Sequence, residues 1–171
     1  NIAAFQTFEL NVFLSLAVRN WAREWITQPI QVKWPNDIMV NDQKLAGLLI
    51  QNSFQGSKLQ YSILGLGINV NQTQFETYQP PATSLRLLAN TEFELEALEQ
   101  SLFASIEQYY LKLKQGKIKQ LRSEYLQYLW NFRQTAIFQP ANGGPFRGMI
   151  SGIDKQGKLL IQTEKEERAF G

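Results

Sequence analysis

The stretch KWPNDIMVNDQKLAGLLI, Lys33 to Ile50, decides how the rest of the chain is interpreted. It sets a lysine, an indole, a proline, an amide and a carboxylate side by side in a region otherwise typical of a buried strand. Proline cannot donate to a strand ladder, so Pro35 ends the short strand IQVKW. A lysine at a strand end is commonly a solvated edge charge. Alternatively, Pro35 directs the Lys33 ammonium into a pocket, where a compact cation suits a carboxylate or a phosphate. Asn36 and Asp37 alone are typical of a plain turn.

Glycines interrupt two neighbouring strands of the same region. Gly65 and Gly67 lie two apart in GLGINVN, so in a regular strand both leave the same face of the sheet without a side chain. Asn69 continues that face with a donor and an acceptor, and Gly47 interrupts KLAGLL in the same way. A cleared face admits the close approach of a flat ligand. The motif lacks the third glycine and the helix start of a dinucleotide fingerprint, which excludes a Rossmann interpretation.

Composition limits the classes of protein that the chain can represent. Its 171 residues suffice for one domain, or for one domain with a small appendage, and a hydrophobic content of 44% allows a proper core. The 17 basic and 15 acidic residues give a net charge of +2, which does not favour nucleic acid. The absence of cysteine and histidine excludes disulfides, thiolate zinc sites and Cys or His nucleophiles. No stretch is long enough for a membrane span and no secretory signal is present, so we expect a cytoplasmic protein.

The first half of the chain predicts one helix followed by a small sheet. Apolar residues recur at helical spacing over residues 7–25. The strands KLAGLLIQNSF and LQYSILGLGINV are joined around Gly56, which favours a hairpin. Residues 31–71 therefore predict a mostly antiparallel sheet, and the polar residues 71–81 predict a loop.

The second half predicts helices and then short strands. TSLRLLA is typical of a short helix capped by Thr83 or Ser84. A long amphipathic helix is expected from Leu95 to Leu113, ending at Gly116, and a further helix over residues 118–129. From about residue 132 the pattern favours a separate β module rather than an extension of the first sheet. Its expected apolar interior comprises Ile137, Phe146, Ile150, Ile153 and Leu160.

These motifs together resemble the biotin protein ligases. KWPNDIMVNDQKLAGLLIQ followed by ILGLGINVN is similar to the core of that family, PPATSL to the segment that follows, and FRGMISGIDKQGKLLI to its C-terminal β domain. The resemblance covers nearly the whole chain from Gln31 onward. It implies an α+β fold related to class II aminoacyl-tRNA synthetases, with a mixed or antiparallel sheet and packed helices. The implied domains are a catalytic domain over residues 1–131 and an SH3-like β domain over residues 132–171.

The resemblance also implies a reaction and a set of site residues. Biotin and ATP give biotinyl-5′-AMP and pyrophosphate, and a lysine of the biotin carboxyl carrier protein of acetyl-CoA carboxylase then takes the biotinyl group. Lys33 corresponds to the lysine at the junction of carboxyl and phosphate; Gly47, Gly65 and Gly67 to strand positions against biotin; and Asn69 to the asparagine near the adenylate. Mg²⁺ is implied by ATP, with no ligands assigned. A homodimer is compatible with the family, and DNA binding is not expected without a helix-turn-helix.

One feature of the family has no counterpart in this sequence. A glycine- and arginine-rich loop of pattern G-R-G-R-x-G precedes KWPND in the family, whereas the residues before Lys33 contain only Arg19 and Arg23. The chain also begins at Asn1 without a methionine, so we expect a fragment of a longer protein. Two alternatives are therefore retained. One is a lipoate or octanoate transferase of the same fold; the other is a catalytically incomplete protein that still binds the carrier.

Overall fold

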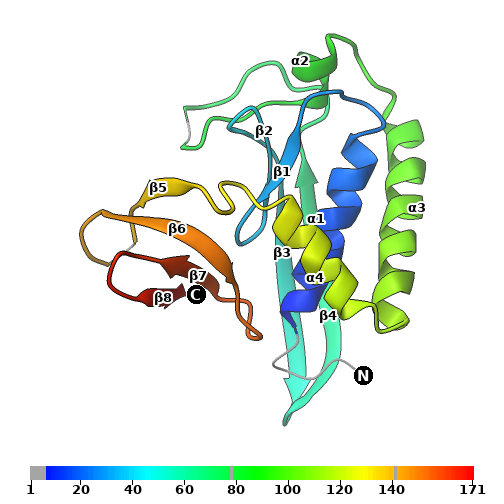
Figure 1. The fold of residues 1–171 in the computed structure, drawn as a ribbon. Helices are drawn as coiled ribbons and strands as arrows, with labels where there is room; N and C mark the ends of the chain where they lie inside the picture. Colours follow the sequence, from blue (N-terminus) through cyan, green and yellow to red (C-terminus); the bar gives the residue numbers. More distant parts are fainter. Residues whose placement is uncertain (1–6, 78, 141) are drawn as a thin grey trace.

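The computed structural model describes residues 7–77, 79–140 and 142–171, and within them it shows an α+β fold with two antiparallel sheets. Helices and the first sheet form one part of the molecule, and the second sheet lies beside it (Figure 1). The elements in chain order are α1 (Phe8–Ala22), β1 (Ile30–Lys33), β2 (Asp37–Val40), β3 (Gln43–Gln55), β4 (Lys58–Ile68), α2 (Leu85–Ala89), α3 (Leu95–Lys114), α4 (Ile118–Gln127), β5 (Thr135–Phe138), β6 (Phe146–Ile153), β7 (Leu159–Gln162) and β8 (Glu167–Phe170).

Helix α1 is the centre of the core. Its apolar residues recur on more than one face, so the helix is buried nearly all round, with Trp21, Phe13 and Leu14 each at most 2% exposed. Arg19 is also buried, because its Nε donates to the carbonyl of Ile30 at 3.0 Å and its guanidinium lies over a tyrosine ring. The helix ends at Ala22, three residues before the predicted end.

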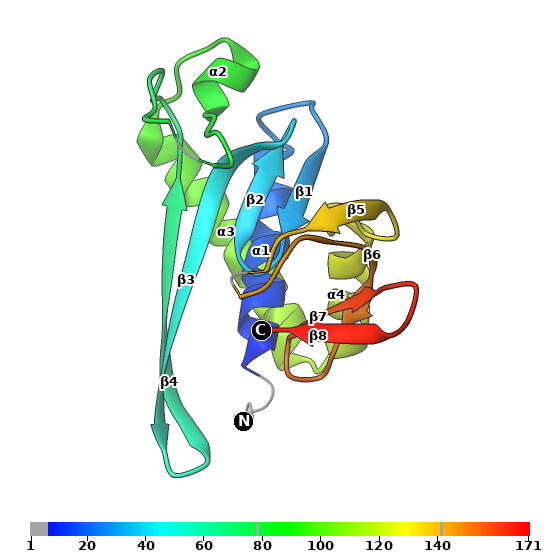
Figure 2. The same ribbon diagram turned by 90° about the vertical axis from the view of Figure 1, so that its left-hand side faces the viewer.

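The first sheet has the strand order β1–β2–β3–β4 with every neighbouring pair antiparallel. Ile30 and Val32 of β1 alternate with half-buried neighbours, as expected for a strand with one face on the core. Helices α1 and α3 cover one face of this sheet, and Figure 2 looks onto the face that they leave uncovered. Strands β3 and β4 continue beyond the helices as a two-stranded ribbon that turns at Gly56, which has φ +59°.

The helices after the first sheet follow the sequence pattern with two refinements. Ser84, not Thr83, caps α2, because its Oγ accepts a hydrogen bond from the Leu87 amide at 3.2 Å. Helix α4 ends at Gln127 instead of Leu129. The residues after it leave the helix to bond the free edge of β1: Val32 N donates to Tyr128 O and Trp130 N to Val32 O, both at 2.8 Å.

The second sheet has the order β5–β6–β7–β8 and shares no strand pairing with the first. Ile150 pairs with Ile161, whereas Ile68 pairs with Ala46, so the strands do not extend the main sheet. Whether residues 132–171 fold as a separate domain stays a prediction. The buried residues of this sheet belong to the same apolar cluster as α1 and the first sheet.

The expected interior of the second sheet was partly wrong. Ile137 is 78% exposed, because it lies on the outward side of the edge strand β5. On β7 the buried residues are Leu159 and Ile161, so Leu160 between them points the other way and is only half-buried. Ile150 is buried as predicted, at 4% exposed.

Candidate functional site

Three of the predicted site residues, Lys33, Gly47 and Gly67, lie in one row across the uncovered face of the first sheet, whereas Gly65 in β4 and Asn69 directly after β4 lie on either side of it. The strand register sets Lys33 opposite Asp37, Asp37 opposite Gly47, and Gly47 opposite Gly67. Directly paired residues of antiparallel strands point to the same side, so the four positions share one face. The intervening row of Val32, Ile38, Ala46 and Ile68 points to the helices. The four strands therefore bring one lysine, one aspartate and two glycines together on one face.

The turn after Lys33 is hydrogen-bonded to strand β3. Asn36 Nδ2 donates to the Leu48 carbonyl at 2.6 Å, and the Leu48 amide donates to the Asn36 carbonyl at 2.9 Å. Asn36 directly precedes β2 and Asp37 pairs with Gly47, so these two bonds continue the β2–β3 pairing by one residue and hold the tip of the β1–β2 hairpin against β3. The peptide bond between Trp34 and Pro35 is cis. Asn36 is therefore more than a turn residue, since its side chain determines where the strand end lies.

Lys33 is half-buried and lies next to an indole ring. Its Nζ is 5.2 Å from the centroid of the Trp130 ring, within the range of a cation–π contact. Among the residues that the structure describes, no carboxylate lies within ion-pair distance of Lys33. The ring itself is held by a hydrogen bond from Trp130 Nε1 to Asp42 Oδ1 at 2.9 Å. The ammonium is thus located by an aromatic face and is not neutralised by an acid.

Asp37 is paired with a different lysine, which sequence reasoning missed. Lys44 Nζ lies 2.6 Å from Asp37 Oδ1, and the Asp37 side chain is 18% exposed. A Cβ added at Gly47 would stand 3.0 Å from both Lys44 Cε and Nζ. Gly47 therefore leaves room for the Lys44 side chain to lie across β3. Lys44 precedes the apolar run LAGLL, and only the register shift at Ile38/Met39 reveals its place beside Asp37.

The other two glycines face open space. A Cβ added at Gly67 would have no neighbour nearer than the Gly47 carbonyl oxygen at 4.0 Å. At Gly65 the nearest atoms would be Leu49 O at 3.4 Å and Leu49 Cβ at 3.6 Å. Neither glycine is required by the packing of the described chain. The open floor that they form is consistent with a flat ligand lying on the backbone.

Asn69 lies at the end of β4, where three segments meet. Its amide donates to the Leu45 carbonyl at 3.0 Å, its carbonyl accepts from the Leu85 amide at 3.1 Å, and its Nδ2 lies 3.4 Å from the Lys44 carbonyl. The loop before α2 bonds the same place, since Lys44 N donates to Pro81 O at 2.7 Å. Asn69 thus connects the glycine-containing strand to the N-terminus of α2.

The ionisable groups with shifted pKa values belong to the helical core. Burial, and then the hydrogen bond to Glu124, raises the pKa of the Tyr109 phenol well above its ordinary value. Burial alone raises the pKa of Tyr125, and burial lowers the pKa of Arg19. These groups lie on helices α1, α3 and α4 and are not members of the row on the sheet.

Among the described residues, neither an acidic cluster suited to a metal ion nor the apolar groove beside α3 coincides with this row. The described ranges contain no group of three acidic side chains that could hold a metal ion. An apolar groove of about 530 Å³ lies between β4 and α3 on the helix side, lined by residues such as Leu66, Leu98 and Ile106. In the described part of the chain, no helix has the length and apolar character needed to cross a membrane.

Comparison with known families and proteins gives a consistent answer. The sequence model of the Biotin/lipoate A/B protein ligase family matches residues 2–69, and that of the Biotin protein ligase C terminal domain matches residues 139–170. The bifunctional ligase/repressor BirA of Bacillus subtilis is 26% identical over 163 residues, covering 94% of this chain and 50% of that protein. The biotin–[acetyl-CoA-carboxylase] ligase of Mycobacterium tuberculosis is 27% identical over 132 residues, covering 77% of this chain and 47% of that protein.

Solved structures show the same fold. The apo biotin protein ligase of Aquifex aeolicus superposes with a TM-score of 0.79 at 24% identity, over 96% of this chain and 72% of that one. Its complex with biotin and ATP superposes with a TM-score of 0.77 at 23% identity, over 96% and 68% of the two chains. The present chain spans about half the length of the curated relatives described above.

The first family match defines the broad class of biotin and lipoate ligases. The second match is specific to biotin protein ligases, and the relatives agree with it. The chain belongs to the biotin protein ligase family.

Proposed function

We propose that the protein activates biotin with ATP and transfers the biotinyl group to a lysine of a carrier protein. In the first step a biotin carboxylate oxygen attacks the α-phosphorus of ATP, and the bond to the bridging oxygen breaks to release pyrophosphate. In the second step the carrier amine attacks the activated carbonyl, AMP leaves, and the amine loses a proton. The observation that carries the proposal is the row Lys33–Asp37–Gly47–Gly67 on an uncovered sheet face in a chain of this family.

Lys33 is the residue that we assign to the chemistry. Both steps develop negative charge on oxygens at the carboxyl–phosphate junction, and a preorganised ammonium stabilises that charge. Within the described residues Lys33 has no carboxylate partner, which supports this role because its charge remains available to a ligand.

The glycines and Asn69 are assigned to substrate binding. Gly65 and Gly67 leave the backbone open to the biotin ring system, whereas Gly47 has a second use in accommodating Lys44. Asn69, at the N-terminal end of α2, is assigned to the adenylate. Mg²⁺ would be held largely by the ATP phosphates, since the described residues offer no acidic cluster.

The partner protein and the C-terminal domain are assigned from the similarity to known relatives and families. Curated relatives named biotin–[acetyl-CoA-carboxylase] ligase support the biotin carboxyl carrier protein of acetyl-CoA carboxylase as the partner. We assign residues 132–171 to an SH3-like domain, supported by the match of residues 139–170. We further propose a cytoplasmic protein that can form a homodimer. DNA binding is not assigned to the present chain, although some of its relatives are named ligase/repressors.

Pyrophosphate release from ATP tests the proposal in the full-length protein, with any residues that precede Asn1 included. We expect release that depends on biotin and formation of biotinyl-5′-AMP. Release that depends on lipoate or octanoate and not on biotin would overturn the substrate assignment. Binding of the carrier without any adenylation would identify a catalytically incomplete protein.

A further inference from the structure

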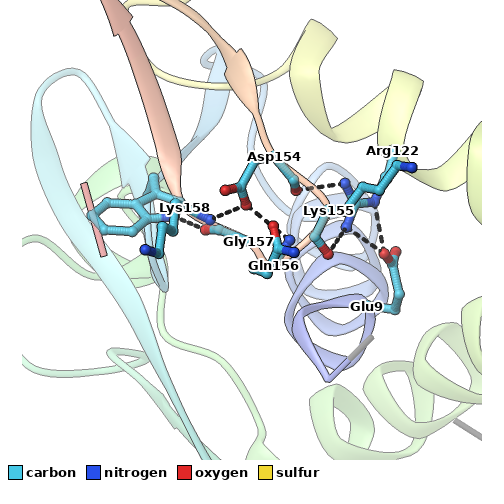
Figure 3. A network of polar contacts seen from close by, with 8 residues as sticks. Glu9, Arg122, Asp154, Lys155, Gln156, Gly157 and Lys158 are labelled. Atoms are coloured by element: carbon cyan, nitrogen blue, oxygen red, sulfur yellow. Dashed lines mark hydrogen bonds and ion pairs between the residues drawn. The ribbon is translucent and has the colours of Figure 1, made fainter. Parts of the chain in front are cut away.

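A turn of the second sheet touches the hairpin that carries Lys33. The turn comprises residues 154–158 between β6 and β7, and Figure 3 shows it between helices α1 and α4 and the first sheet. Lys33 lies at the end of β1, and Trp34 follows it directly. The turn contacts helices α1 and α4 on one side and the β1–β2 hairpin on the other.

On the helix side, a single arginine holds the turn. Arg122 of α4 donates from Nη1 to the Asp154 carbonyl at 2.8 Å and from Nη2 to the Lys155 carbonyl at 3.2 Å. Its Nε and Nη2 also contact Glu9 Oε1 of α1, both at 2.6 Å (Figure 3). The Glu9 side chain is 3% exposed and the Arg122 side chain 25%, so the carboxylate of this pair is shielded from solvent. The turn is therefore tied to two helices through a charged donor.

The turn itself has one well-defined conformation. Asp154 Oδ1 accepts from the amides of Gln156 and Lys158 at 2.8 and 2.9 Å, and the Asp154 amide donates to the Lys158 carbonyl at 3.0 Å. Gly157 has φ +91°, and a Cβ there would overlap the ring of Phe8 in α1. Only glycine satisfies both requirements.

On the sheet side, the turn accepts a hydrogen bond from the site hairpin. Trp34 Nε1 donates to the Gly157 carbonyl at 2.9 Å. The indole also lines a cavity of about 360 Å³ together with Phe138, Phe146 and Phe170 of the second sheet. The Trp34 side chain thus points toward the second sheet, while the preceding residue belongs to the row on the uncovered face.

We infer that the turn 154–158 positions Lys33 through Trp34, which makes Trp34 a positioning residue and the second sheet part of the support of the site. Asn36 fixes the other side of the same hairpin through Leu48. With both anchors in place the strand end has a defined position, and so has the ammonium. The effect on rate rests on the proposed function, because it requires that Lys33 stabilise charge in the adenylation step.

The test is Trp34→Phe, which keeps a ring and removes the one donor to Gly157. Trp21→Phe is the matched control, because Trp21 Nε1 donates to Ser101 Oγ at 2.9 Å in the helical core, remote from the row. We expect biotin-dependent pyrophosphate release by the full-length protein to fall by about fivefold in Trp34→Phe, the loss typical of one neutral hydrogen bond. Trp21→Phe should leave that rate unchanged.

The effect should disappear when Lys33 is absent. In a Lys33→Ala background, Trp34→Phe should cause no further loss, because residues that act as a unit are not additive. An equal loss in both backgrounds would overturn the inference. Asp154→Ala loosens the turn without changing Trp34, and we expect it to reproduce the Trp34→Phe result; an unchanged rate in both variants would also overturn it.

A second readout does not depend on activity. Amide hydrogen exchange of Lys33, Asn36 and Asp37 should be faster in Trp34→Phe than in the wild type, and unchanged in Trp21→Phe. Unchanged exchange in Trp34→Phe would contradict the positioning role. A wild-type protein without biotin-dependent pyrophosphate release would overturn the proposed function alone, since hydrogen exchange would still decide whether the turn holds the hairpin.

Discussion

Gly67→Ala should change stability and ligand affinity in opposite directions. A Cβ at this position would meet only the Gly47 carbonyl oxygen, at an ordinary contact distance of 4.0 Å, so the fold accommodates it without strain. Replacing glycine at a compatible position restricts the unfolded chain and stabilises the folded state by about 0.4–1 kcal/mol. For a chain of this size that corresponds to a Tm higher by about 1–4 °C. Thermal unfolding measures this part of the prediction.

The same methyl group would stand on the floor of the proposed biotin site. Filling a well-packed site costs about 1–3 kcal/mol, and the larger side chain of Gly67→Val should lie at the upper end of that range. Since 1.4 kcal/mol is a factor of ten, the affinity for biotin should fall by about five- to 150-fold. Titration calorimetry on the full-length protein gives the dissociation constant.

Gly144→Ala is the matched control, because Gly144 also has open space around it but lies between β5 and β6, away from the row. We expect a similar gain in Tm with unchanged biotin affinity. Unchanged biotin affinity in both Gly67→Ala and Gly67→Val would remove Gly67 from the site and refute the argument from the open glycine floor.

Three further predictions concern stability. Ser84→Ala removes the cap of α2 and should lower the free energy of unfolding by about 1 kcal/mol, measured by urea denaturation with Ser84→Thr as the control; an unchanged midpoint would contradict the capping role. Arg122→Leu leaves the buried Glu9 carboxylate unpaired and should cost about 3–5 kcal/mol, whereas the double variant with Glu9→Gln should recover part of the loss. The folded-state pKa values of Tyr109 and Tyr125 are raised, so their contribution to the free energy of unfolding is complete below pH 10 and is lost as the pH rises further. In Tyr125→Phe the free energy of unfolding should therefore fall less steeply above pH 10, and a pH profile identical to that of the wild type would contradict this prediction.

The sequence predicted the antiparallel strands that carry the proposed site, because their signals are local. Pro35 and the paired glycines lie in short strands whose alternation fixes which residues share a face. The caps and glycines around α2 and α3 are likewise visible in the sequence. What the pattern could not supply was the partner of Asp37, since Lys44 reaches it only through a register shift between β2 and β3.

The misjudged features depend on long-range contacts. Tyr128 and Leu129 keep a helical pattern but leave α4, and the backbone of residues 128–130 pairs instead with Val32 at the edge of β1. Ile137 and Leu160 are apolar, yet the neighbouring strands of the sheet decide which residues of each short strand face the core. The bond from Trp34 to Gly157 joins residues 123 positions apart, which no local motif reveals.

The most direct test of the account is the rate of biotin-dependent pyrophosphate release in Lys33→Ala, compared with Lys58→Ala at the exposed tip of the β3–β4 ribbon. Removing one preorganised stabilising charge should lower the rate by about 10²–10³-fold, with unchanged thermal unfolding because Lys33 contributes little to the core. Lys33→Arg should restore the rate only in part, since a planar guanidinium places its charge differently. A rate in Lys33→Ala close to that of the wild type and of Lys58→Ala would show that Lys33 is a solvated strand-end charge, and would contradict the account.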